Sequence, residues 1–268
     1  MGPLVTGSAV VGSSALARKL SVKLLQRLAL TFLEPRLASW RYQRDAGGDL
    51  EQTLQGGQMK REEDAGRGDP KETDIPSGEE EEDYEIAEEI EEVVEMLLTG
   101  LRDKDTIVRW SVAKGVGRVT GCLPQELADE VVAQVLELFR PTGTKCGEGV
   151  WYFHIDIALI ALIPQESDAA WHGGCLALAE LARRGLLLPH RLPTVTPIVQ
   201  MALAYDVRRG PHSIGAHVRD AAAYVCWACA RAYEPSLLTD SVQVLASSLL
   251  VGACYDREVN CRCECWTS

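Results

Sequence analysis

The feature that most constrains the fold is a helical pattern that returns repeatedly after residue 84. Apolar residues recur every three to four positions, the spacing of one helix face. A second signal has a longer period, because Arg219 and Arg262 begin similar segments 43 residues apart. This period lies within the roughly 40–47 residues of HEAT and armadillo repeats. The sequence therefore predicts an all-α solenoid, with helices at 84–98, 107–121, 127–139, 169–187, 192–206, 217–233 and 238–256.

Aspartate and arginine mark the start of several of these helices. Asp105–Arg109 carries the pattern Asp-x-x-Val-Arg, and partial echoes follow at 218–222 and 256–262. A helix pair cannot bury its apolar stripe alone, so neighbouring pairs stack. We expect Arg109 and Arg219 to tie the loop of one repeat to the next, which is a structural role. Asp105 and Thr106 are expected to cap the helix that begins near Ile107.

Charge is distributed unevenly along the chain, whose formal net charge is −12. Residues 79–95 contain eleven acidic and no basic residues, while the first 44 residues are basic. This balance argues against a continuous basic surface for nucleic acid but leaves a local basic patch open. The acidic run is expected to be solvated and to favour a helix N-terminus.

Nine cysteines are present, and most lie in alanine- and leucine-rich helical segments. A free thiol in such a segment behaves as a small apolar side chain. The odd number and the lack of a recognisable secretory signal favour a reducing, cytoplasmic compartment.

Several short motifs resemble catalytic or cofactor-binding sequences but fail in spacing or context. Residues 115–121 approximate a dinucleotide fingerprint, yet no strand precedes them. The segment His172–Cys175 resembles an esterase oxyanion loop, whereas 210–215 has the wrong spacing for the nucleophile elbow that such enzymes need. Residues 143–145 lack the remainder of a phosphate-binding loop. Small-residue packing between helices explains 115–121 and 172–175 better.

Two cysteine clusters have spacings compatible with metal or redox chemistry. Cys226 and Cys229 lie in mid-helix without a second ligand pair, so core packing is favoured. Cys261, Cys263 and Cys265 could bind a soft metal, but no fourth ligand is in view. We therefore predict no enzyme, no catalytic residue, no cofactor and no metal site.

The chain divides into four regions. Residues 1–44 form a partial helical segment, and 45–83 a glycine-rich acidic linker too polar to order itself. Repeats follow at 84–260 and a divergent tail at 261–268. Within the repeats, 140–164 contains a run of 15 residues, from Val150 to Pro164, that is shorter than the ~20 residues of a membrane-spanning helix.

Three segments closely resemble the tubulin-folding cofactor D family, also called tubulin-specific chaperone D. They are 101–139, 170–189 and 218–235, and the shorter 31–44 resembles the same family. Tryptophans, glycines and cysteines recur in these long ungapped runs. The resemblance implies an internal HEAT-repeat piece of a much longer chaperone. Residues 140–164 have no counterpart in the family, so we expect an insertion that loops out or packs a short element on the surface.

The resemblance also implies a function. The family captures β-tubulin and acts in assembly and disassembly of the αβ-tubulin heterodimer, with stimulation of GTP hydrolysis by tubulin. Expected partners are β-tubulin, cofactors E and C and an ARF-like small GTPase, in the cytoplasm or at microtubules, centrosomes or cell junctions. No partner-binding residue can be assigned, and neither a nucleic-acid partner nor a transmembrane segment is expected. The alternative is a HEAT scaffold for nuclear transport or chromosome organisation.

Overall fold

The computed structural model describes residues 14–34, 87–140, 167–209 and 212–267. Its helices are α1 (Ala15–Phe32), α3 (Glu88–Gly100), α4 (Thr106–Thr120), α5 (Gln125–Glu137), α7 (Asp168–Arg183), η1 (Pro189–Arg191), α8 (Leu192–Leu203), α9 (Ala216–Ala232), α10 (Pro235–Tyr255) and α11 (Val259–Thr267). A short antiparallel hairpin joins β1 (Val207–Arg209) to β2 (His212–Ile214), with Val207 opposite Ile214. The predicted all-α solenoid is confirmed, with this hairpin added.

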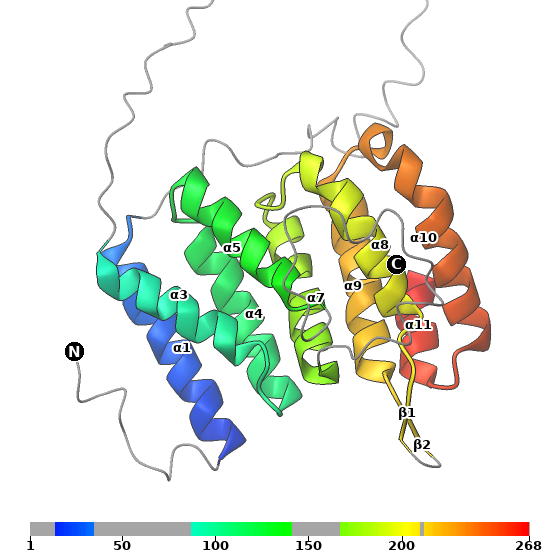
Figure 1. Ribbon diagram of the computed structural model, residues 1–268, viewed down its shortest axis with the longest axis horizontal. Coiled ribbons are helices and arrows are strands. Elements are labelled where there is room, and N and C mark those ends of the chain that lie inside the picture. Colours follow the sequence, from blue (N-terminus) through cyan, green and yellow to red (C-terminus); the bar gives the residue numbers. More distant parts are fainter. Residues whose placement is uncertain (1–13, 35–86, 141–166, 210–211, 268) are drawn as a thin grey trace, which may run out of the picture.

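The helices form two layers. In the first layer α1, α4, α7, α9 and α11 contact one another in chain order and run side by side (Figure 1). The second layer consists of α3, α5, α8 and α10, which pack on α4, α7, α9 and α11 respectively. Each second-layer helix thus precedes its first-layer partner in sequence. This is the arrangement of stacked helix pairs in a solenoid.

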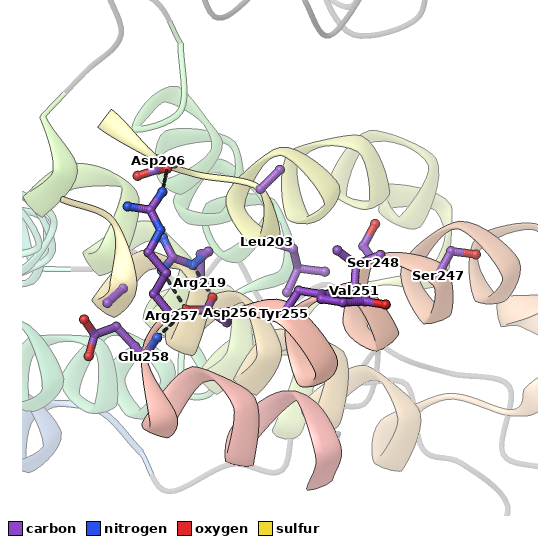
Figure 2. Close-up of a pocket in the computed structure, with 13 residues that line it drawn as sticks. Leu203, Asp206, Arg219, Ser247, Ser248, Val251, Tyr255, Asp256, Arg257 and Glu258 are labelled. Carbon is purple, nitrogen blue, oxygen red and sulfur yellow. Dashed lines mark hydrogen bonds and ion pairs between the residues drawn. The ribbon is translucent and has the colours of Figure 1, made fainter. Parts of the chain in front are cut away.

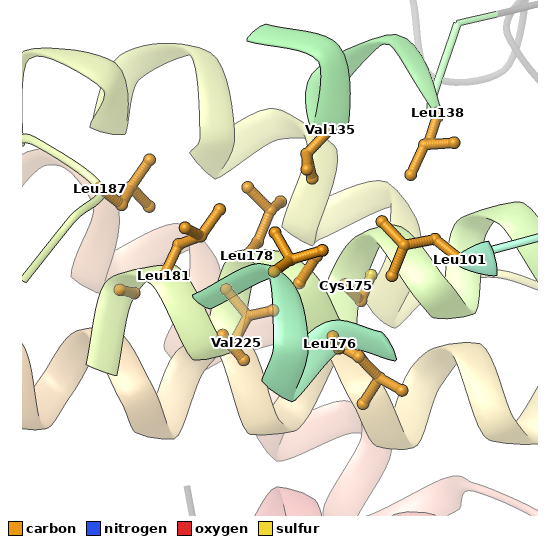
Figure 3. Packing of buried hydrophobic residues seen from close by; sticks show 14 of the residues in the cluster. Leu101, Val135, Leu138, Cys175, Leu176, Leu178, Leu181, Leu187 and Val225 are labelled. Carbon is orange, nitrogen blue, oxygen red and sulfur yellow. The ribbon is translucent and has the colours of Figure 1, made fainter. Parts of the chain in front are cut away.

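The core follows the apolar stripes predicted from the sequence. Val108, Val112, Val116 and Val119 of α4 are all buried. The centre is α7, in which every residue from Ala170 to Ala182 is buried because helices cover it on both sides and in the second layer. Figure 3 shows leucines of this helix meeting side chains from the neighbouring helices. The α7 sequence is therefore apolar or small almost all round, as expected for a central helix.

Glycines in α7 allow close backbone contact. A Cβ on Gly173 would lie 2.0 Å from the carbonyl oxygen of Leu101, and one on Gly174 would lie 2.5 Å from the Phe139 ring. Likewise, a Cβ on Gly117 of α4 would lie 2.8 Å from Nε of Arg184. The packing interpretation of 115–121 and 172–175 is confirmed.

Helix boundaries differ from the sequence predictions in two informative places. Asp105 occupies the position before α4, but its carboxylate makes no hydrogen bond to the helix and instead accepts one from Arg18. The prediction that the Asp105 side chain caps α4 is therefore wrong, because this carboxylate is hydrogen-bonded by Arg18 of the preceding repeat. The last helix, α11, crosses the boundary expected at residue 260 and runs to Thr267.

The linker at 45–83 and most of the segment 140–164 lie outside the described residues. The helices on either side of the second segment in sequence are described. Helices α5 and α7 flank it in sequence and contact each other as one pair. In sequence the segment thus lies between two helices that contact each other, and its interpretation as an insertion into one repeat stays a prediction.

Candidate interaction surfaces

An arginine stands at the fourth position of four of the five first-layer helices. These residues are Arg18, Arg109, Arg219 and Arg262. In the three later ones, the guanidinium donates to backbone carbonyls of the segment that connects the preceding α-helix to its own helix. Arg109, for example, donates from Nη1 to the oxygens of Asp103 and Lys104 at 2.6 and 3.0 Å. These bonds satisfy carbonyls that a helix end would otherwise leave unpaired.

The same arginines also contact the next repeat. Arg18 donates to Asp103 at 2.8 Å, and Arg219 donates through Nε and Nη2 to the two oxygens of Asp256 at 2.5 and 3.0 Å. Burial alone would raise the pKa of Asp103, but the hydrogen bonds from Arg18 and from the Asp105 backbone, together with the charges of Arg18 and Arg109, outweigh it, so the pKa lies below its usual value. Asp256 behaves in the same way beside Arg219. The predicted structural role of Arg109 and Arg219 is confirmed.

The pattern changes at α7. Its fourth residue is Trp171, whose ring packs edge-on against Phe139 at 5.1 Å and tilted against Tyr205 at 5.4 Å. In this repeat the Nε of Arg109 donates not to an aspartate but to Nδ1 of His172 on α7, at 2.8 Å. Burial, the neighbouring guanidinium and His217 lower the pKa of His172 to about 3, so this imidazole is neutral at physiological pH.

The residues that resembled an esterase site do not form one. Nδ1 of His172 accepts a hydrogen bond from Nε of Arg109, so this nitrogen is already occupied and does not act as the general base for a nucleophile. Cys175 is completely buried, and burial raises the pKa of its thiol far above the usual value. Such a thiol is an inert core residue. Within the described residues, His172 and Cys175 therefore act in packing.

The cysteine clusters are packed in the same manner. Cys226 and Cys229 lie in the buried face of α9, as predicted, and burial raises the pKa of both thiols. Cys261 and Cys265 of α11 are buried, while Cys263 of the same helix is exposed. No group of three His, Cys, Asp or Glu side chains in the described part of the chain is arranged to hold a metal ion.

A groove of about 630 Å³ lies where α8, α9 and α10 meet the loop before α11 (Figure 2). Two of its lining residues pair with each other, since Arg257 donates to the Asp206 carboxylate at 3.2 Å. The buried pair of Arg219 and Asp256 also forms part of the lining. Because its charges are largely paired with each other, the groove has no strong preference for an anion or a cation. Sequence reasoning missed it, since its walls come from four separate elements.

Both ends of the stack expose apolar side chains. In α1 the exposed residues are Leu16, Leu20, Leu24, Leu28 and Phe32, and in α10 they are Leu237, Val242, Val244, Leu250, Val251 and Tyr255. By length and composition α10 is also able to span a membrane. Its most apolar stretch has a mean hydropathy of 1.5, and only 6% of that stretch is buried. It nevertheless packs on α8 and α11 as a repeat helix, and Thr196 of α8 hydrogen-bonds Ser241 at 2.8 Å. Exposed apolar area of this extent is typical of interaction surfaces.

Comparison with known proteins assigns the repeats. The sequence model of a family described as "Tubulin-specific chaperone D-like, ARM repeats" matches residues 16–152 and 154–265. The chain belongs to this family. It is 43% identical over 251 residues to the tubulin-specific chaperone D of Dictyostelium discoideum, and 31% identical over 173 residues to the tubulin-folding cofactor D of Schizosaccharomyces pombe. No solved structure matches it.

The chain spans only a small part of these family members. The alignments cover 94% and 65% of the chain but 16% and 15% of the two relatives. The matched residues therefore correspond to a set of chaperone D repeats that makes up only part of these relatives.

Proposed function

We propose that this chain is a tubulin-folding chaperone segment that binds β-tubulin in the assembly and disassembly of the αβ-tubulin heterodimer. The observation that carries the proposal is family membership across nearly all the described repeats. Two relatives bear names that state a tubulin-specific or tubulin-folding role. The fold supports it physically, because a two-layer helical stack presents broad surfaces suited to a large folded partner.

Recognition by surface, rather than catalysis, fits the chemistry of the described residues. His172 is hydrogen-bonded by Arg109, Cys175 is fully buried, and Asp256 is paired with Arg219. In the proposed role, the chain works with cofactors E and C and an ARF-like GTPase, and any stimulation of GTP hydrolysis uses the nucleotide site of tubulin. The proposed location is the cytoplasm, with association at microtubules, centrosomes or cell junctions.

Retention of newly folded tubulin tests the proposal. The tagged chain is incubated with β-tubulin released from the chaperonin, with α-tubulin prepared in parallel, and the retained subunit is quantified. We expect β-tubulin to be retained in preference to α-tubulin. An unrelated helical-repeat protein of the same size serves as the control. Equal retention of both subunits, or retention no greater than that of the control, would contradict the proposal for this chain.

A further inference from the structure

The two layers of the stack carry opposite charge. Helices α3, α5, α8 and α10 contain ten acidic residues and no basic one. Helices α1, α4, α7, α9 and α11 contain eleven basic and four acidic residues. This segregation is hidden in the sequence, because the two sets of helices alternate along the chain. The net charge of −12 therefore coexists with a basic first layer.

Exposed cations of this layer gather around a row of aromatic rings. Trp110 of α4 and Tyr224 of α9 lie 5.4 Å apart, so their rings meet across α7, which lies between these helices. Trp227 stacks on the other side of Tyr224 at 5.7 Å. Lys114 covers the Trp110 ring at 5.6 Å, and Arg231 covers the Trp227 ring at 5.3 Å. Such contacts hold a cation in place at the surface.

Hydrogen bonds to Glu180 of α7 connect the ring of Tyr224 to two further arginines. The Tyr224 hydroxyl donates to Glu180 at 3.2 Å, and Arg183 and Arg184 donate to the same carboxylate at 2.9 and 3.2 Å. The Glu180 side chain is fully buried, while those of Arg183 and Arg184 are 42% and 28% exposed. One buried carboxylate thus orients two guanidinium groups and neutralises only one of their charges.

Arg118 extends the row toward α1. It is exposed on α4, close enough to Arg184 to affect its pKa, and donates to Gln26 of α1 at 3.3 Å. The α1 helix has four basic residues and no acidic one. We call the surface formed by Lys114, Arg118, Arg183, Arg184 and Arg231, with the three rings between them, the cationic face.

We propose that the cationic face binds an acidic segment of a partner polypeptide, rich in glutamate and aspartate. Five cations lie on this surface, and the buried carboxylate of Glu180 pairs with only two of them, so the remaining positive charge steers acidic groups toward it. Arginine forks also match carboxylates geometrically. The hydrogen bonds and ring contacts fix the cations beforehand, so less side-chain entropy is lost on binding.

A single-stranded nucleic acid fits this surface less well. Proteins that bind single-stranded nucleic acid need exposed aromatic ring faces on which the bases stack. Here Lys114 lies over Trp110, Arg231 lies over Trp227, and Tyr224 is between the two tryptophans. The acidic second layer would also repel a long phosphate backbone.

Fluorescence anisotropy with a labelled peptide of ten glutamates tests the inference on the full chain. We expect binding that weakens at least tenfold between 50 and 200 mM salt, as for an interaction of several charges. The double variant Lys114→Glu/Arg231→Glu should weaken it by a further tenfold or more. The matched control is Arg257→Glu, an exposed arginine outside the face, which should change affinity less than twofold per charge reversed.

The variants are first compared by circular dichroism and unfolding midpoint. If the double charge reversal disturbs folding, Lys114→Gln/Arg231→Gln replaces it, with an expected loss of at least threefold. Absence of peptide binding, or equal losses in the face variant and the control, overturns the inference. Tighter binding of a ten-nucleotide oligothymidine than of the peptide would instead assign the face to nucleic acid. The assay contains no tubulin, so its outcome is independent of the proposed function.

Discussion

Gly173 offers a direct test of how closely the repeats pack. In Gly173→Ala, the new Cβ would lie 2.0 Å from the Leu101 carbonyl oxygen and 2.8 Å from its carbon. A carbon and a carbonyl oxygen normally approach no closer than about 3.3 Å. The loop after α3 must therefore move about 1.3 Å away from α7, in a region where both residues are buried.

We expect this change to lower the free energy of unfolding by about 2–3 kcal/mol, the upper part of the range for overpacking. The estimate includes the gain of up to ~1 kcal/mol that alanine brings to a helix relative to glycine. Urea unfolding followed by circular dichroism at 222 nm measures it. Gly121→Ala is the control, since its nearest contact would be an ordinary 3.5 Å and its backbone is α-helical, so stability should stay equal or rise slightly. A Gly173→Ala protein as stable as wild type would refute the reasoning.

Three further predictions concern the arginines, the buried imidazole and the exposed apolar helix. Arg219→Met removes two hydrogen bonds to the Asp256 carboxylate and one to the Tyr205 carbonyl, and should lower the free energy of unfolding in urea by about 2–4 kcal/mol. An unchanged urea midpoint would contradict the structural role of Arg219. Because the folded-state pKa of His172 is about 3, the unfolded chain binds the extra proton between about pH 6.5 and 3, so stability falls as pH drops through that window. In urea unfolding measured between pH 7 and 4, His172→Gln should make this loss of stability smaller. The control His190→Gln, which changes an exposed histidine, should leave the loss as large as in the wild type. Leu250→Gln/Val251→Gln removes two side chains that are each 60% exposed, and should reduce concentration-dependent self-association in sedimentation velocity without lowering the urea midpoint.

The sequence predicted the helices well because their apolar stripes are local signals. It also identified Arg109 and Arg219, since their motif repeats along the chain. The β1–β2 hairpin was missed, although 207–214 has two short runs around Gly210–Pro211, a common turn dipeptide. Its strands have only three residues each, too few for a clear alternation.

The candidate surfaces were harder to foresee than the helices. Trp110 and Tyr224 are 114 positions apart, and only the stacking of three helices brings their rings together. The role of Glu180 as a shared acceptor likewise depends on α7 being central. Charge segregation between layers would have been visible only after each helix had been assigned to a layer. These properties arise from packing order, which periodicity alone does not determine.

The arginine contacts between repeats have a consequence for how this chain tolerates changes in length. Arg18 and Asp103 are 85 positions apart, whereas Arg219 and Asp256 make the equivalent contact over 37. The entropy of closing the longer loop exceeds that of the shorter by only roughly 0.7 kcal/mol, because it grows with the logarithm of length. A single well-placed ion pair offsets such a difference. Long segments can therefore be gained or lost between two repeats while the helices on either side keep their register.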